Sequence, residues 1–147
     1  MKIIEPTTSE EFTKYYNLRY EILRKPWGQP TGSERDEAEE TSIHRMIIDK
    51  ETGDAIAVGR LQFNSIHEAQ IRYMAVADDL QGKGLGSQII SALENVAQGE
   101  GIQKIILSAR VNALQFYKNN GYKIVKKTHL LFGEIQHWLM GKELTTD

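Results

Sequence analysis

Residues 72–86 restrict the fold of this chain more than any other segment, because an extended stretch runs there into a glycine-rich turn that opens a helix. The alternation across residues 68–76 is typical of a strand. From Gly84 onward, apolar residues recur at three- and four-residue spacing until Gly99 and Gly101, which can end a helix. A strand, a tight turn and a helix in this order predict a fold that mixes helices with a sheet.

The turn itself has the properties of an anion-binding site. A helix N-terminus leaves four N–H groups unpaired, and the helix dipole makes that end positive. Gly82, Gly84 and Gly86 remove side chains that would keep a phosphate away from those groups, and Lys83 adds a mobile cation. A pyrophosphate is therefore expected here. The turn is not a Walker A loop, which needs a Lys-Ser/Thr pair, and Ser87 replaces the third glycine of the dinucleotide fingerprint.

Hydrophobic periodicity and turn residues predict the other elements. Two capping-box spacings, Thr7/Glu10 and Thr8/Glu11, precede an amphipathic helix that should end before Pro26, and residues 24–42 should form a long loop. Strands are expected at residues 3–4, 44–48, 55–63, 68–76, 104–107, 122–126 and 135–142, with a short helix at residues 112–120. Strict alternation would place Ile71, Tyr73 and Ala75 on one face of the 68–76 strand and Gln70, Arg72, Met74 and Val76 on the other.

Composition limits the class of protein. The chain of 147 residues has 40% hydrophobic and 26% charged residues, which is ordinary for one soluble domain spanning residues 1–147. No signal peptide or membrane span is apparent, so a cytoplasmic location without a membrane partner is expected. The net charge is −2 and no basic stripe is present, which argues against a nucleic-acid partner. Because the chain has no cysteine, disulfides, thiolate metal sites and a cysteine nucleophile are excluded.

The densest charge run is acidic and covers residues 34–40. We expect either a solvated loop or a negative lip that concentrates a cationic amine.

Two motifs together resemble the GNAT superfamily of N-acetyltransferases. The turn QGKGLG at residues 81–86 matches the family's Gln/Arg-Gly-x-Gly-x-Gly/Ala loop, and residues 112–122 are similar to its Asn-x-x-Ala-x-x-Phe-Tyr helix, although the alanine comes early, at Ala113. The resemblance implies the GNAT acyl-CoA N-acyltransferase fold: an α/β domain with a mixed, mostly antiparallel sheet of six to seven strands flanked by helices. It also implies acetyl transfer from acetyl-CoA to an amine acceptor, with no metal.

In this family the glycine-rich loop holds the coenzyme A pyrophosphate and the preceding strand contacts the pantetheine arm. Carried over by position, the resemblance implies that the following residues bind the cofactor: Met74, Ala75, Val76, Gln81, Gly82, Lys83, Gly84, Leu85, Gly86, Ser87, Asn112, Phe116 and Tyr117. We expect Asn112 to cap the short helix as well.

Acetyl transfer to an amine needs a neutral amine, a polarised carbonyl and a proton for the leaving thiolate. The resemblance makes Tyr117 the candidate acid. Many relatives place a basic carboxylate on the strand before the turn, but the corresponding face here carries Gln70, which cannot take a proton. Glu68 and His137 are the candidate bases, with His44 a weaker one, and a water chain or an amine that arrives neutral stays open.

The leading interpretation is an N-acetyltransferase that acts on a small-molecule or protein amine by direct transfer in a ternary complex. A coenzyme-A-binding sensor or partner-binding module with the same fold is the alternative, and a nucleotide-phosphate binder is a third. Trp27, in the long loop, is expected to meet substrate or a second subunit. Exposed terminal strands leave a homodimer open.

Overall fold

The computed structural model describes residues 2–144. Its helices are α1 (Ser9–Leu23), α2 (Leu85–Gly99) and α3 (Leu114–Asn119), with 3-10 turns η1 (Lys25–Trp27), η2 (Asp78–Leu80) and η3 (Val111–Ala113). Its strands are β1 (Lys2–Ile4), β2 (Ile43–Ile48), β3 (Ala55–Phe63), β4 (Glu68–Val76), β5 (Lys104–Arg110), β6 (Lys123–Leu131) and β7 (Ile135–Glu143). None of the helices within this range is long and apolar enough to cross a membrane.

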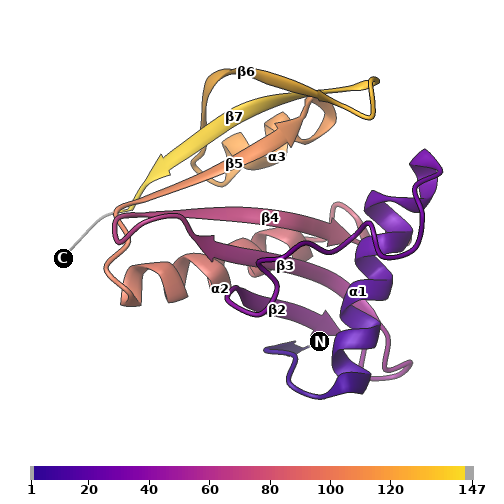
Figure 1. Cartoon of the computed structure of the whole chain (residues 1–147). Coiled ribbons are helices and arrows are strands. Elements are labelled where there is room, and N and C mark those ends of the chain that lie inside the picture. The colour runs from indigo at the N-terminus through magenta and orange to yellow at the C-terminus, as the bar shows by residue number, and fades with distance from the viewer. Residues whose placement is uncertain (1, 145–147) are drawn as a thin grey trace.

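Within the described residues, the seven strands form one sheet in the order β1-β2-β3-β4-β5-β7-β6. Every neighbouring pair is antiparallel except β4 and β5, which the helix α2 connects in parallel. Helices α1 and α2 cover opposite faces of the sheet, and α3 lies beside β5 (Figure 1). The mixed, mostly antiparallel sheet flanked by helices is the predicted fold class.

Most element boundaries follow the sequence prediction, and three differ. The structure selects the Thr8/Glu11 capping box, in which the Glu11 N–H donates to the Thr8 hydroxyl at 3.1 Å. Strands β5 and β6 extend several residues beyond the expected ends. The expected helix at residues 112–120 is divided into η3 and α3, and α3 is capped at Ala113 without a side-chain hydrogen bond. Asn112 therefore does not cap this helix as predicted.

A bulge in β4 overturns the predicted division of its side chains between two faces. Val58 of β3 pairs with Ala75 and Arg60 pairs with Arg72, so two residues of β4 oppose Gly59. One of them, Tyr73, has a φ of +57°, a conformation uncommon for residues other than glycine. An extra residue reverses the alternation beyond it.

The reversal distributes β4 between the two cores. Ile71, Met74 and Val76 pack in the core beneath α2, whereas Ala75 packs beneath α1 and the Tyr73 ring meets the α1 side chain of Arg19. Strict alternation would instead put Met74 on the other face of the sheet from Ile71. Gly59 makes the bulge sterically feasible, because a Cβ there would lie 2.6 Å from the Met74 sulfur.

A buried ion network fills the α1 face of the sheet. Arg19 of α1 and Arg60 of β3 are both 0% exposed. Asp36 binds Arg60 through both carboxylate oxygens, at 2.7 and 3.1 Å, in the bidentate geometry that suits a guanidinium. Glu39 Oε2 bridges the two arginines at 2.9 and 2.8 Å. The network ties the loop between η1 and β2 to both α1 and β3.

The network corrects both expectations for the acidic run. Glu34 is buried, and its carboxylate accepts from the Gly32 N–H and from Arg35. Asp36 and Glu39 face Arg60 inside the protein instead of forming a lip. Glu37 and Glu40 are exposed, so the solvated interpretation holds for these two alone among the acidic side chains of the run.

Asp36 makes the free energy of unfolding depend on acid pH. Hydrogen bonds from Arg60 hold the pKa of Asp36 at about 2, below its ordinary 3.8. A lowered folded-state pKa stabilises the protein above 3.8, by roughly 2 kcal/mol here, and this contribution is lost as the pH falls toward 2. We expect Asp36→Asn to lower the free energy of unfolding measured with urea at pH 7. The difference in this free energy between the variant and the wild type should become smaller below pH 3.8.

The exposed Glu37 of the same loop offers the matched control, Glu37→Gln, which should unfold like wild type throughout. A constant difference between Asp36→Asn and wild type across the acid range would contradict the assignment.

Candidate functional site

The sheet opens between β4 and β5. Parallel pairing joins Glu68 to Lys104 and continues only as far as Gln70 and Ile106. Beyond that point the two strands diverge, as Figure 1 shows from the end near the C-terminus toward the end near α1. Backbone groups of β4 that point toward β5 in this stretch have no partner on that strand, and two pockets border the opening.

The first, which we call the turn pocket, has a volume of about 440 Å³ and lies at the start of α2. Gly82 and Gly84 adopt φ values of +79° and +84°, the left-handed region that favours glycine. The N–H of Gln88 reaches back to the Gly84 carbonyl at 3.1 Å, so the N–H groups before it are those a helix start leaves without helical partners. This geometry suits a pyrophosphate.

The turn pocket brings together nearly all the residues predicted to bind the cofactor. Lys83 is the exception, since it is exposed and does not line the pocket. The others all line it: Met74, Ala75, Val76, Gln81, Gly82, Gly84, Leu85, Gly86, Ser87, Asn112, Phe116 and Tyr117.

Packing also requires a glycine at position 86. A Cβ on Gly86 would lie 2.8 Å from the ring of Phe116, so this glycine lets α3 pack closely against the start of α2. For Gly82 and Gly84 the backbone conformation is the reason, because a Cβ at either would meet nothing within 4 Å. The two sequence motifs are thus in direct contact through Gly86 and Phe116.

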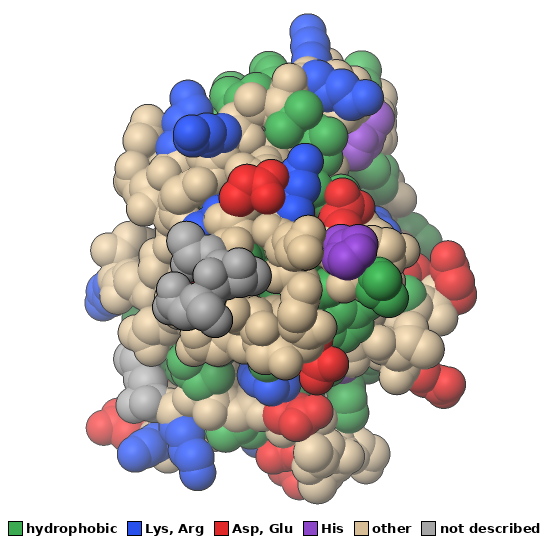
Figure 2. All heavy atoms as spheres, turned by 90° about the vertical axis from the view of Figure 1, so that its left-hand side faces the viewer, with side chains coloured by type: hydrophobic (Ala, Val, Ile, Leu, Met, Phe, Trp, Pro, Cys, Tyr) green, Lys and Arg blue, Asp and Glu red, His purple; other side chains and the backbone are tan. Residues whose placement is uncertain are grey.

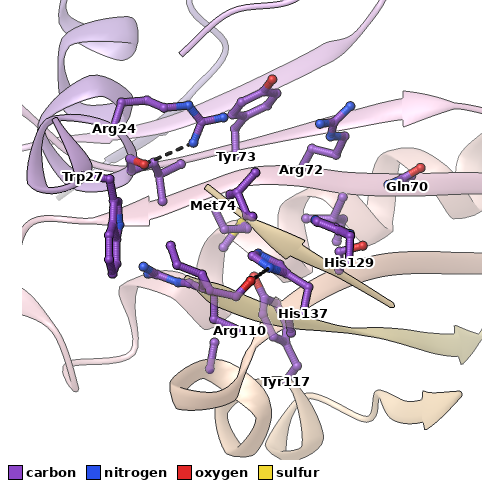
Figure 3. A pocket seen from close by; sticks show the side chains of 17 residues that line it. Arg24, Trp27, Gln70, Arg72, Tyr73, Met74, Arg110, Tyr117, His129 and His137 are labelled. Carbon is purple, nitrogen blue, oxygen red and sulfur yellow. Dashed lines mark hydrogen bonds between the residues drawn. The ribbon is translucent and has the colours of Figure 1, made fainter. Parts of the chain in front are cut away.

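The second pocket, about 410 Å³, we call the arginine pocket. In Figure 3 the β4 side chains Gln70, Arg72 and Met74 lie across from Arg110 and His137, with Arg24 and Trp27 at one end. Its lining residues are Leu23, Arg24, Trp27, Gln70, Ile71, Arg72, Tyr73, Met74, Ser108, Ala109, Arg110, Ala113, Tyr117, His129, Leu131, Ile135 and His137. Four of these also line the turn pocket, namely Met74, Arg110, Ala113 and Tyr117.

One ring nitrogen of His137 forms a hydrogen bond with the backbone, and the other has no hydrogen-bond partner among the described residues. Its Nδ1 lies 3.0 Å from the Ile135 carbonyl, which can only accept, so Nδ1 carries the proton in the neutral ring and Nε2 keeps its lone pair. The ring stacks on His129 with centroids 4.6 Å apart. Burial, with smaller contributions from His129 and Arg110, lowers the pKa of His137 below 6.5. A neutral imidazole at physiological pH can accept a proton.

Tyr117 lies where the two pockets meet. Its side chain is buried, and its ring packs edge-on against Phe116 with centroids 5.0 Å apart. Burial raises the pKa of the phenol above its ordinary 10.0, and Arg110 opposes the rise. The hydroxyl therefore keeps its proton throughout the physiological pH range, as a proton donor must.

The other candidate bases lie elsewhere. Glu68 lines neither pocket: it begins β4 where the sheet is closed, and Asn64 donates to its carboxylate at 3.2 Å. Strict alternation would put Glu68 on the same face of β4 as Val76, but the bulge between them puts the two side chains on opposite faces. His44 is buried in the ion network, where Nε2 lies 2.7 Å from the Glu39 carbonyl and Nδ1 lies 2.8 Å from the Tyr15 hydroxyl. Both of its nitrogens are thus committed.

Sequence reasoning missed Arg24, Arg110 and His129 as pocket residues. Arg110 closes β5, whose predicted end was three residues too early, and β6 was expected to stop before His129. Trp27 was predicted to meet substrate or a second subunit, and it lines the arginine pocket. Arg72, which also lines this pocket, forms an ion pair with Asp36 at 3.3 Å.

The model of the acetyltransferase (GNAT) family matches residues 10–122. The chain belongs to the GNAT family. It is 28% identical over 143 residues to the uncharacterized N-acetyltransferase YjcF of Bacillus subtilis strain 168, covering 97% of this chain and all of that protein. This places it among enzymes that are acetyltransferases.

Solved structures of the family share the fold. An aminoglycoside 6′-N-acetyltransferase complexed with coenzyme A superposes with a TM-score of 0.82 at 16% identity, covering 100% of this chain and 99% of that one. A GNAT family acetyltransferase from Elizabethkingia anophelis with acetyl-CoA bound gives 0.77 at 16%, covering 97% of each chain. These complexes support a cosubstrate of the coenzyme A type.

The pyrophosphate site can be tested with two residues that tolerate a left-handed backbone at position 84. Asn and Asp both adopt positive φ more readily than other side chains, and the pocket has room for either. Because they differ in charge and hardly in shape, Gly84→Asp should weaken acetyl-CoA binding at least about tenfold more than Gly84→Asn, measured by calorimetry. Equal affinities in the two folded variants would move the phosphates to another site.

Proposed function

We propose that this enzyme transfers the acetyl group of acetyl-CoA directly to a primary amine in a ternary complex. The observation that carries the proposal is the junction of the two pockets at Met74, Arg110, Ala113 and Tyr117. Cofactor held in the turn pocket would present its thioester at this junction, and an amine entering through the arginine pocket would meet it there. The arrangement favours direct attack by the amine, with no acyl-enzyme stage.

The start of α2 binds the pyrophosphate through its N–H groups, and β4 receives the pantetheine arm along its open edge. Unpaired β4 N–H groups in the opening are available to the thioester carbonyl oxygen as it gains negative charge. The amine nitrogen forms a bond to the carbonyl carbon while the carbon–sulfur bond breaks. His137 Nε2 takes the amine proton, directly or through water, and the Tyr117 hydroxyl supplies a proton to the departing sulfur.

A coenzyme-A-binding module without turnover is the second candidate, because Gln70, which cannot take a proton, occupies the pocket wall and no carboxylate of the described residues lines it. His137 in the same pocket offers a proton acceptor that such a module would not need. A thiol-release assay with a panel of amines separates the two functions: a module binds acetyl-CoA without amine-dependent release of the thiol.

Tyr117→Phe keeps the aromatic ring and deletes the proton donor. Packing against Phe116 should survive, acetyl-CoA affinity should change little, and turnover should fall by about 10²–10⁴-fold if thiolate departure limits the rate. Steady-state thiol release measures the effect. A variant with wild-type turnover and an unchanged basic limb of the pH profile would show that Tyr117 serves cofactor packing.

His137→Gln should remove the acid limb of the rate profile. A base must be neutral, so wild-type kcat/KM should rise with pH through the pKa of His137, and burial places that limb below pH 6.5. Without the imidazole the limb should disappear and the rate should fall by about 10²-fold or more. His44→Gln is a control for loss of an imidazole outside the pockets, and should keep the limb. A persisting limb in His137→Gln would assign the base elsewhere.

A further inference from the structure

The charges that line the arginine pocket are all of one sign. Arg24, Arg72 and Arg110 line it, and among the described residues no aspartate or glutamate does. Acidic and basic side chains are interspersed on the face of the molecule that Figure 2 shows, whereas the pocket lining has basic side chains alone among its Asp, Glu, Lys and Arg residues. The chain as a whole carries a net charge of −2.

Two of the three guanidinium groups have no acidic partner. Arg24 donates only to neutral acceptors, the Ser33 carbonyl at 3.0 Å and the Leu23 carbonyl at 3.1 Å. The backbone of Arg110 pairs with His137 of β7, but its guanidinium makes no hydrogen bond or ion pair with another described residue. Arg72 differs, because Asp36 lies 3.3 Å from it and offsets its charge.

The acidic side chains of the neighbouring loop cannot compensate the other two. Asp36 and Glu39 are directed into the network with Arg19 and Arg60, and the Glu34 carboxylate pairs with Arg35. None of the three lines the pocket. The Arg24 guanidinium is also partly desolvated, since its central carbon lies 5.5 Å from the centre of the Tyr73 ring and 5.6 Å from that of the Phe132 ring. Burial lowers the pKa of this guanidinium. A desolvated cation without a counter-ion is stabilised when an anion binds beside it.

We propose, building on the acetyltransferase function above, that the acceptor is a small amine that carries a carboxylate or phosphate group bound between Arg24 and Arg110. The three cations serve the reaction as well, because positive charge near an amine lowers its pKa and favours the neutral, nucleophilic form. They oppose entry of a polycationic acceptor. The likeness to an aminoglycoside acetyltransferase at 16% identity shows the fold alone.

Binding to the coenzyme-A-bound protein tests the acceptor class without requiring turnover. Calorimetry would compare two matched pairs, β-alanine with β-alanine amide and glucosamine 6-phosphate with glucosamine, and would include spermidine as a polycation. We expect at least one anionic amine to bind about 10–100-fold more tightly than its neutral partner. The member of the panel that shows the preference distinguishes carboxylate from phosphate.

Variants locate the anion. Arg110→Gln and Arg24→Gln should each reduce that preference about tenfold or more. Coenzyme A affinity should stay near wild type in Arg24→Gln, because Arg24 does not line the turn pocket, and it is measured in Arg110→Gln as well. Lys118→Gln removes a charge from an exposed position of α3 outside both pockets and should leave the preference intact. Because Arg110 borders both pockets, the coenzyme A measurement excludes a role for it in the cofactor site alone.

The inference is overturned if neither anionic amine binds more tightly than its neutral partner, or if spermidine binds best. It is also overturned if both arginine variants keep the full preference. Thiol release with the same amines reports separately on the proposed function. Tight binding of an anionic amine without thiol release would overturn the proposed acetyl transfer and leave the anionic ligand in place. Thiol release with neutral or cationic amines alone would overturn the anionic acceptor and support acetyl transfer.

Discussion

The extra residue of β4 opposite Gly59 determines how the two faces of the sheet are used. A strand with strict alternation would direct Met74 and Val76 to the same face as Gln70, away from Ile71. With the bulge, Ile71, Met74 and Val76 all join the core beneath α2, and Met74 reaches the junction of the two pockets. The backbone strain of Tyr73, at a φ of +57°, is tolerated because packing on both faces fixes the strand around it.

The same bulge sets Tyr73 among four arginines. The centre of its ring lies 4.3 Å from the guanidinium carbon of Arg19, 4.8 Å from that of Arg60, 5.1 Å from that of Arg72 and 5.5 Å from that of Arg24. An aromatic face attracts such cations, but it cannot neutralise them. Asp36 and Glu39 neutralise the two that are fully buried, and this is what holds the loop after η1 against the sheet. Tyr73 lines the arginine pocket and contacts Arg19 and Arg60, so this part of the pocket wall depends on the ion network.

The sequence predicted the parts of the molecule that local chemistry determines. The strands at residues 55–63 and 68–76, the helix after Gly84 and the glycine-rich turn before it all follow from periodicity, glycine and helix-start rules that act within a few residues. The bulge could not be predicted, because it depends on Gly59 facing Met74 from another strand. The pairing of the acidic run with Arg19 and Arg60 is equally non-local, so Asp36 and Glu39 resembled ordinary solvated residues. The pairing of Glu68 with Lys104, which keeps this carboxylate in the closed part of the sheet, is non-local in the same way.

The arginines around Tyr73 and the arginine pocket differ in whether a carboxylate neutralises them. The buried Arg19 and Arg60 are matched by carboxylates, as the cost of removing a charge from water requires. In the arginine pocket, Arg24 and Arg110 lack acidic partners, although Arg24 is also partly withdrawn from solvent. The loop supplies Glu39 to the two buried arginines alone, and it shares Asp36 between Arg60 and Arg72 of the pocket. An unmatched charge is tolerated where a pocket opens to water and a ligand can replace that water. The side of Tyr73 that faces the opening between β4 and β5 is thus where the protein leaves an electrostatic requirement for a ligand to meet.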